Sequence, residues 1–201
     1  AWDYAGPISA ADEGQVLKIR GTVTEFRGAL QLNMERLRRT EPRDSVDKSA
    51  LVATAPVDGE KAWAEVERLV ESIADPDYRS VCRRLLEEKG EALRTIPAAK
   101  SVHHSFLGGL LMHTWTMLRA ADFLAGLYPE TVDRSLLLAG TLLHDLSKAE
   151  EFSFSPLGLV TEYSLKGQLL GHLVMGAQEA ARAAEELAIP EEKAVLLQHM
   201  I

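Results

Sequence analysis

Three histidines and one aspartate have the types and spacing to hold a metal ion. His113 lies in an apolar segment, the adjacent pair His144-Asp145 ends a second one, and His172 falls in a third. An ionised carboxylate in such surroundings costs several kcal/mol unless it is paired or bound to a metal. Imidazole and carboxylate are common ligands of divalent transition metals. Three helical segments could therefore bring ligands to one point, which predicts a metal-dependent hydrolase.

The apolar neighbours of two of these histidines predict that their rings face the core. His113 shares a helical face with Met117 and Leu124, and His172 shares one with Leu169. A lone histidine in such a place is more often a hydrogen-bonded core residue than a ligand. That interpretation stays open for each ring, whereas inward histidines on separate helices together favour a metal site.

The helix before the His-Asp pair, Leu136 to Leu143, is apolar on almost every side and is therefore expected at the centre of the fold. Gly140 and Thr141 lie one turn before the pair and are expected to leave space for an ion. The alternative for His144 is a histidine at a helix end that interacts with the last carbonyl groups.

The composition is that of a globular protein. The chain has 201 residues, of which 46% are apolar and 26% charged, enough to bury a core. The single cysteine, Cys82, excludes a disulfide framework and a cysteine zinc cluster, and it is expected in the core. Residues 1–4 lack the basic flank and apolar run of a signal peptide, and no segment is suited to a membrane span. A cytoplasmic location without a membrane partner is expected.

Residues 15–38 are typical of a β-hairpin, with a turn at Arg27-Gly28-Ala29. Leu30, Leu32 and Met34 alternate with polar residues, which predicts one buried and one polar face. A hairpin of this size is not stable alone, so we expect it to belong to a small β domain.

The N-terminal segment is basic although the whole chain has a net charge of −8. Residues 15–48 hold eight basic and five acidic residues, including the cluster Arg36, Arg38 and Arg39. This distribution suits local contacts with nucleic-acid phosphates, although a solvated strand face explains it equally well.

Helical patterning dominates the rest, and the predicted fold class is mainly α with a preceding β segment. The expected division is a β segment at 1–39, a linker at 40–58 and a helical domain at 59–201. Among the expected helices are those at 105–127, 133–148 and 164–187.

Several motifs resemble known families. The His … His-Asp pattern resembles the HD superfamily of metal-dependent phosphohydrolases. HHSFLGGLLMHT (103–114), LLLAGTLLHDLSK (136–148) and GQLLGHLVMGA (167–177) are similar to segments of the YhaM-type 3′–5′ exoribonucleases, in which an OB-fold precedes the HD domain. VLKIRGTVTEFRGALQLNMERLR (16–38) is similar to the last strands of that OB-fold.

The resemblance implies an HD-domain helical bundle, C-terminally incomplete, after a partial OB-fold-like segment that binds nucleic acid. It implies one or two divalent ions of Mn, Fe, Co or Zn. The implied ligands are His113, His144, Asp145 and His172, of which Asp145 could bridge two ions. The chain departs from the family in having HDLSK for the common HDIGK and Met112 where a glutamate is frequent. The last family ligands would fall beyond Ile201.

The resemblance also suggests residues that act on the substrate. The catalytic candidates are Asp145, Lys148 and His104. Lys148 could contact a phosphate oxygen, or it could be a lysine favoured by the helix dipole. His104 could reach the scissile phosphate. His199 is expected to contact the ligands or the substrate rather than the ion.

The implied function is hydrolysis of phosphodiester bonds by a 3′–5′ exoribonuclease on single-stranded RNA, with single-stranded DNA and homo-oligomerisation left open. A first alternative is a phosphohydrolase of nucleotides or cyclic dinucleotides, which the β segment disfavours. A second alternative is a non-catalytic nucleic-acid-binding protein.

Overall fold

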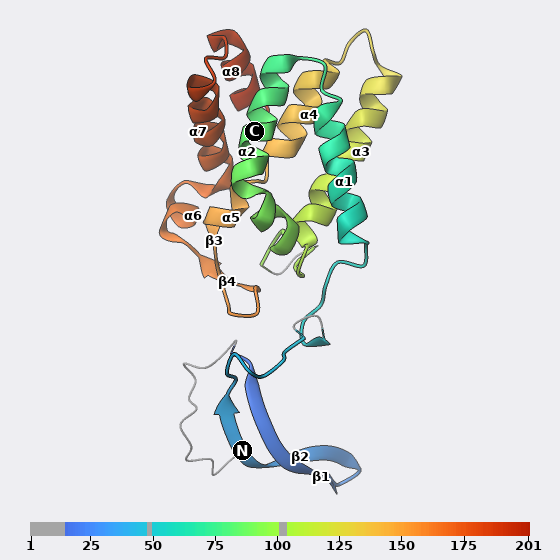
Figure 1. Cartoon of the computed structure of the whole chain (residues 1–201), viewed down its shortest axis with the longest axis vertical. Coiled ribbons are helices and arrows are strands. Elements are labelled where there is room, and N and C mark those ends of the chain that lie inside the picture. Colours follow the sequence, from blue (N-terminus) through green and yellow to red (C-terminus); the bar gives the residue numbers. More distant parts are fainter. Residues whose placement is uncertain (1–14, 48–49, 101–103) are drawn as a thin grey trace. The chain divides into compact units, whose positions relative to one another are not determined.

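The computed structural model describes residues 15–47, 50–100 and 104–201. The chain forms two compact units. The first extends to Leu51 and includes Ser155–Leu157, and the second comprises Val52–Phe154 and Gly158–Ile201. The first contains a β-hairpin and the second is helical (Figure 1). The predicted mainly α fold with a partial β segment is confirmed.

The hairpin consists of antiparallel strands β1 (Leu17–Phe26) and β2 (Ala29–Arg39). Arg27 and Gly28 join them with φ angles of 51° and 80°. Two consecutive residues with positive φ form the type of turn whose twist matches the twist of the flanking strands. The predicted turn is therefore confirmed.

A β-bulge keeps the apolar side chains of β2 on one face. The register shifts between Arg20 and Gly21, which makes Glu35 the extra residue of β2. Because side chains alternate along a strand, one extra residue reverses the pattern. The apolar series that reaches Met34 therefore continues on the same face at Leu37.

This apolar face was predicted to be buried, and for the described residues that prediction is wrong. Leu30 is 79% exposed and Val23, on the same face of β1, is 63% exposed. A two-stranded ribbon is a single layer, and its apolar face is buried only where a second layer packs against it.

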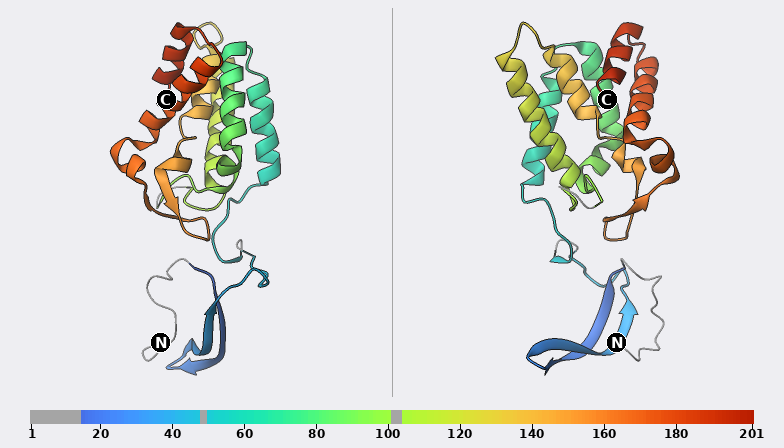
Figure 2. Two further views of the ribbon diagram at one scale, coloured as in Figure 1. Left: turned by 60° about the vertical axis from the view of Figure 1, so that its left-hand side comes forward. Right: turned by 180° about the vertical axis from the view of Figure 1, so that it is seen from behind.

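The second unit is a bundle of helices with a short hairpin (Figure 2). Its elements are α1 (Gly59–Glu71), α2 (Pro76–Thr95), α3 (Gly109–Leu127), α4 (Arg134–Leu143), α5 (Lys148–Glu151), β3 (Phe152–Phe154), β4 (Val160–Tyr163), α6 (Leu165–Leu169), α7 (Gly171–Glu186) and α8 (Glu191–His199). Aspartates start three of the helices: Asp58, Asp75 and Asp133 each accept a hydrogen bond from a backbone N–H of the first turn. Within the described residues, no helix combines the length and apolar character needed to cross a membrane.

Helix α4 lies in the middle of this bundle, as predicted. It packs against α1, α2, α3 and α8. Leu138, Ala139 and Leu142 are completely buried. The residues that directly follow α4 therefore lie next to the core.

Two of the expected helices are each divided. The segment 133–148 leaves the α-helix after Leu143 and continues as tight turns, with the Leu146 N–H donating to the Leu143 carbonyl group. The segment 164–187 is divided at Gly171, whose φ of 73° is incompatible with a right-handed helix.

Cys82 is a probe of this core. Its side chain is buried, and burial raises the pKa of the thiol to about 12, so the reactive thiolate is almost absent at neutral pH. We expect the thiol reagent DTNB to leave the native chain unmodified and to titrate one thiol per chain in denaturant. Rapid modification of the native chain would contradict the packing of α2.

Candidate metal centre

Asp145 lies at the centre of three imidazole rings. Its Oδ2 atom is 3.3 Å from His113 Nε2 and 3.3 Å from His144 Nε2. Its Oδ1 atom is 3.3 Å from His172 Nε2. The two Nε2 atoms of His113 and His144 are 3.4 Å apart. The four residues expected to be ligands thus meet at one place, although they come from α3, the end of α4 and α7.

These separations fit the ligand shell of an ion. Two atoms that are each about 2.1 Å from a metal lie about 3.0 Å apart at a right angle and about 3.4 Å apart at the tetrahedral angle. Distances of 3.3–3.4 Å are longer than most N–H···O hydrogen bonds. His113, His144 and Asp145 form a cluster that could hold a metal ion.

The end of α4 explains how two consecutive residues face the same point. Neighbouring residues inside an α-helix point in directions about 100° apart, so they do not share a face. α4 ends at Leu143, and the tighter turns that follow, with Leu146 bonded to Leu143 and Lys148 to Asp145, bring both His144 and Asp145 to the cluster. The apolar helix before them places this turn in the interior, where Asp145 is 3% exposed.

Hydrogen bonds at the outer nitrogens orient two of the rings. His144 Nδ1 lies 2.7 Å from the Thr141 carbonyl oxygen, and His172 Nδ1 lies 2.9 Å from Glu151 Oε1. These oxygens accept, so each Nδ1 carries a hydrogen, and each Nε2 points into the cluster, where a metal ion would replace its hydrogen. Metal-binding histidines are typically held by such partners. Thr141 therefore orients a ring through its carbonyl group.

Glu151 is a residue that the sequence interpretation missed. It is 5% exposed, and its Oε1 atom also accepts from the backbone N–H of His172 at 3.1 Å. The sequence offered one signal, an acidic pair that begins two residues after the HDLSK motif ends. It could not identify the partner, because the contact depends on the helix break at Gly171.

The electrostatics of the cluster favour an ionised carboxylate. Burial alone would raise the pKa of Asp145, but hydrogen bonds from His113 and His144 outweigh it and hold that pKa well below its usual range. Burial lowers the pKa of His144, but the hydrogen bond and the charge of the neighbouring Asp145 carboxylate outweigh burial, so the net shift of this pKa is upward. Asp145 is thus an anion at neutral pH, which a metal ligand must be.

The predicted apolar faces of the histidines are only partly correct. Met117 and Leu124, expected in the core beside His113, are 43% and 47% exposed, and Leu169, expected beside His172, is 74% exposed. The histidines line a partly open site rather than a sealed core. For Leu169 the cause is the break at Gly171, which separates it from the helix of His172.

The glycine before the His-Asp pair has a different use from the one predicted. A Cβ atom on Gly140 would lie 2.6 Å from Met200 Cβ. On α7, a Cβ on Gly176 would lie 3.0 Å from Ile201 Cγ2. These glycines admit the residues that follow α8, and the expectation that Gly140 leaves space for an ion is wrong.

The other candidate residues lie at different distances from the cluster. Lys148 Nζ is 2.8 Å from Asp145 Oδ2 and forms an ion pair with it. The ring of His104 is 5.5 Å from that of His113 between centroids. His199 is exposed at the end of α8, and in the described ranges no hydrogen bond or ion pair joins it to the cluster.

The three arginines of the hairpin do not form one cluster. Arg36 and Arg38 lie on the polar face, opposite Arg20 and Lys18, whereas Arg39 alternates to the other face. Arg38 also donates to Asp44 at 2.6 and 2.9 Å. The hydrogen bond from Arg38 holds the pKa of the Asp44 carboxyl well below its usual range. Arg36 is exposed.

Comparison with known proteins finds relatives of one kind. The chain is 39% identical over 199 residues to the 3′-5′ exoribonuclease YhaM of Shouchella clausii, covering 96% of this chain and 61% of that protein. It is 36% identical over 187 residues to the 3′-5′ exoribonuclease YhaM of Listeria innocua, covering 93% and 58%. The predicted resemblance to YhaM-type exoribonucleases is confirmed. The chain spans about three fifths of the length of these relatives. No protein-family model and no solved structure matches it.

The role of Glu151 can be tested through metal affinity. In Glu151→Gln the acceptor of His172 loses its charge, so the ring is held less firmly. Such outer partners typically contribute 10–100-fold to metal affinity, and we expect the Kd for Mn²⁺, measured by calorimetry, to rise about tenfold. Glu162→Gln, an exposed change on β4, is the control. Equal affinity of the two variants would show that Glu151 does not support the site.

Proposed function

We propose that this protein is a metal-dependent 3′–5′ exoribonuclease that acts on single-stranded RNA. The observation that carries the proposal is the convergence of three imidazoles on one buried carboxylate at separations that fit an ion. The direction and the RNA substrate are inferred from the relatives, which are named 3′-5′ exoribonucleases. Single-stranded DNA remains a second substrate to test.

The proposed ligands are His113, His144 and Asp145 for a first ion. His172 faces the other oxygen of Asp145, and we infer that the carboxylate could bridge to a second ion on that side. A set of imidazole nitrogens with one carboxylate suits Mn²⁺, Fe²⁺, Co²⁺ or Zn²⁺, whereas Mg²⁺ prefers more oxygen ligands.

In the proposed mechanism the chain's own residues orient and stabilise. A bound ion supplies Lewis-acid chemistry, because it activates water and offsets charge on the phosphoryl oxygens. Thr141 and Glu151 fix the ring orientations. Lys148 is a cation at the edge of the cluster, where it could turn from Asp145 to a phosphate oxygen. His104, close to His113, is proposed to contact the scissile phosphate, and His199 the substrate.

We further propose that the helical unit is an HD-type domain and that the hairpin is part of an OB-fold-like module, with a linker at 40–58. An OB-fold binds single strands through backbone contacts and base stacking. The basic polar face of the hairpin supports this assignment. The alternatives, a nucleotide or cyclic-dinucleotide phosphohydrolase and a non-catalytic binder, are not favoured, because the relatives are named exoribonucleases.

Asp145→Asn tests the proposed function directly. The variant keeps the shape of the side chain but loses the anion on which the imidazoles converge, so we expect metal content near zero with normal helical content. Shortening of a 5′-labelled single-stranded RNA from its 3′ end should be almost abolished. Elemental analysis and gel assays measure the two effects, with Glu162→Gln as control. Full metal content in Asp145→Asn would refute the site.

Arg36→Ala tests the role of the hairpin. We expect weaker binding of a long single-stranded RNA at low salt, with the slope of log K against log salt reduced by about 0.7, the share of one phosphate contact. Hydrolysis of a small model phosphodiester should be unchanged, because that substrate has no extended strand of phosphates for the hairpin to bind. Arg39→Ala, on the apolar face, is the matched control. A large loss on the small substrate would contradict this division of roles.

A further inference from the structure

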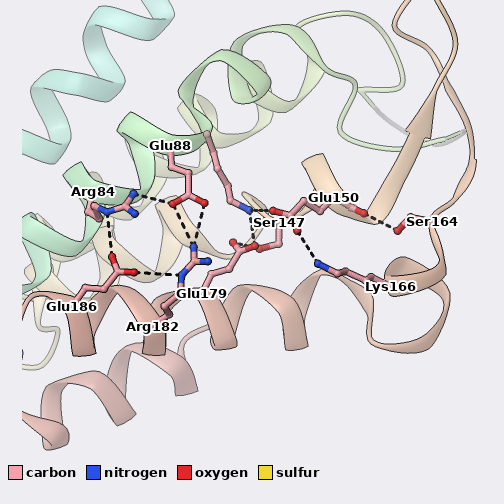
Figure 3. Close-up of polar contacts among 10 residues, drawn as sticks. Arg84, Glu88, Ser147, Glu150, Ser164, Lys166, Glu179, Arg182 and Glu186 are labelled. Carbon is pink, nitrogen blue, oxygen red and sulfur yellow. Dashed lines mark hydrogen bonds and ion pairs between the residues drawn. The ribbon is translucent and has the colours of Figure 1, made fainter.

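An ion-pair network centred on one buried lysine borders the candidate metal centre. Lys89 of α2 is 5% exposed, and its amine donates to Glu179 Oε1 at 2.6 Å and to Glu150 Oε1 at 2.9 Å. The other oxygen of Glu179 accepts a hydrogen bond from Ser147 Oγ at 2.7 Å. Figure 3 shows Ser147, Glu150 and Glu179 turned toward one another. The network thus joins α2, α5, α7 and the turn that precedes α5.

The Ser147 side chain bonds to this network instead of capping a helix. It is the residue before the first turn of α5, where a serine normally caps the helix by accepting from a backbone N–H. Its side chain makes no such hydrogen bond and is completely buried. Its hydroxyl group donates to Glu179 instead. Because Ser147 is two residues after Asp145, Glu179 holds the turn that carries the central carboxylate.

The same network reaches the third histidine by two routes. Glu179 and His172 are both on α7, seven residues apart, a spacing that places them on the same face of a helix. Glu150 is adjacent to Glu151, which accepts from both the ring and the backbone N–H of His172. Glu179 therefore links the turn that carries Asp145 to the helix that carries His172, and Lys89 joins Glu179 to Glu150 of α5.

A purely structural role does not account for this arrangement. Helices α2 and α7 are already joined at the surface by Arg182, which bonds to Glu88 at 3.2 Å. A buried ion pair loses much of its Coulomb energy to desolvation, and well-packed apolar side chains of similar volume often stabilise a protein as well or better. A polar network whose hydrogen bonds are all satisfied adds directional contacts, which rigidify the elements that it joins.

We propose that Lys89 and Glu179, acting through Ser147, are positioning residues for the metal centre. They hold the turn of His144 and Asp145 in a fixed position relative to α7, so that His172 meets Oδ1 of Asp145. This inference rests on the proposed function, because it assumes that the cluster binds a metal.

The test compares metal affinity with folding in the same variants. We expect Ser147→Ala and the double variant Lys89→Met/Glu179→Met to bind Mn²⁺ about tenfold more weakly by calorimetry, the scale of losses in outer partners of metal ligands. Helical content and the thermal midpoint without metal should stay close to wild type. The absorption spectrum of bound Co²⁺, which reports ligand geometry, should also change. Arg182→Gln, which removes an exposed link between the same helices and leaves the Lys89 network in place, should leave affinity and spectrum unchanged.

Each outcome decides between the proposals. Wild-type Mn²⁺ affinity and Co²⁺ spectrum in both variants would overturn the positioning role and leave the proposed function intact. If the double variant does not fold, Ser147→Ala decides, because it removes a single oxygen atom. Loss of helical content in Ser147→Ala would overturn the inference by showing a folding role. A wild-type chain that binds no Mn²⁺, Co²⁺ or Zn²⁺ would refute the metal site itself.

Discussion

The carboxylate of Asp145 is ionised and buried at the end of an apolar helix, and its neighbours are arranged around that constraint. An isolated charge in such a place is too costly to persist, so cations or donors must converge on it. Three imidazoles do so, and the Lys148 amine occupies a further position. The central place of α4 produces this concentration of polar groups. The same cluster of His113, His144 and Asp145 could hold a metal ion.

The buried polar groups that contact Asp145 also need hydrogen-bond partners of their own. The outer nitrogens of His144 and His172 are satisfied by the Thr141 carbonyl group and by Glu151. Behind them, the Ser147 hydroxyl group donates to the half-buried Glu179, whose other oxygen accepts from Lys89. Successive layers of hydrogen bonds of this kind hold a ring in one orientation, and ring orientation decides whether its lone pair faces the ion.

Sequence reasoning reached the features that depend on local pattern. The His-Asp pair at the end of an apolar run predicted both the central helix and the convergence of the histidines, and Arg27-Gly28 predicted the turn of the hairpin. The features it missed depend on contacts between distant segments. Glu151 meets His172 only because the helix breaks at Gly171, and Lys89 meets Glu179 only because α2 packs against α7. No periodicity within one element contains that information. Gly140 was misjudged for the same reason, because its neighbour Met200 is far away in the sequence.

The candidate ligands of the helical unit are packed, whereas the side chains of the hairpin are largely exposed. This difference suits the roles proposed for the two units. In the helical unit the candidate ligands rest on rigid, packed elements, which is what a metal site needs in order to keep its geometry. The hairpin is amphipathic, with Val23 and Leu30 on one face and Arg20 and Arg36 on the other. Contact with a flexible polyanion through exposed cations depends on charge more than on exact geometry. Precise coordination is therefore expected from the bundle, and strand binding that weakens with salt from the hairpin.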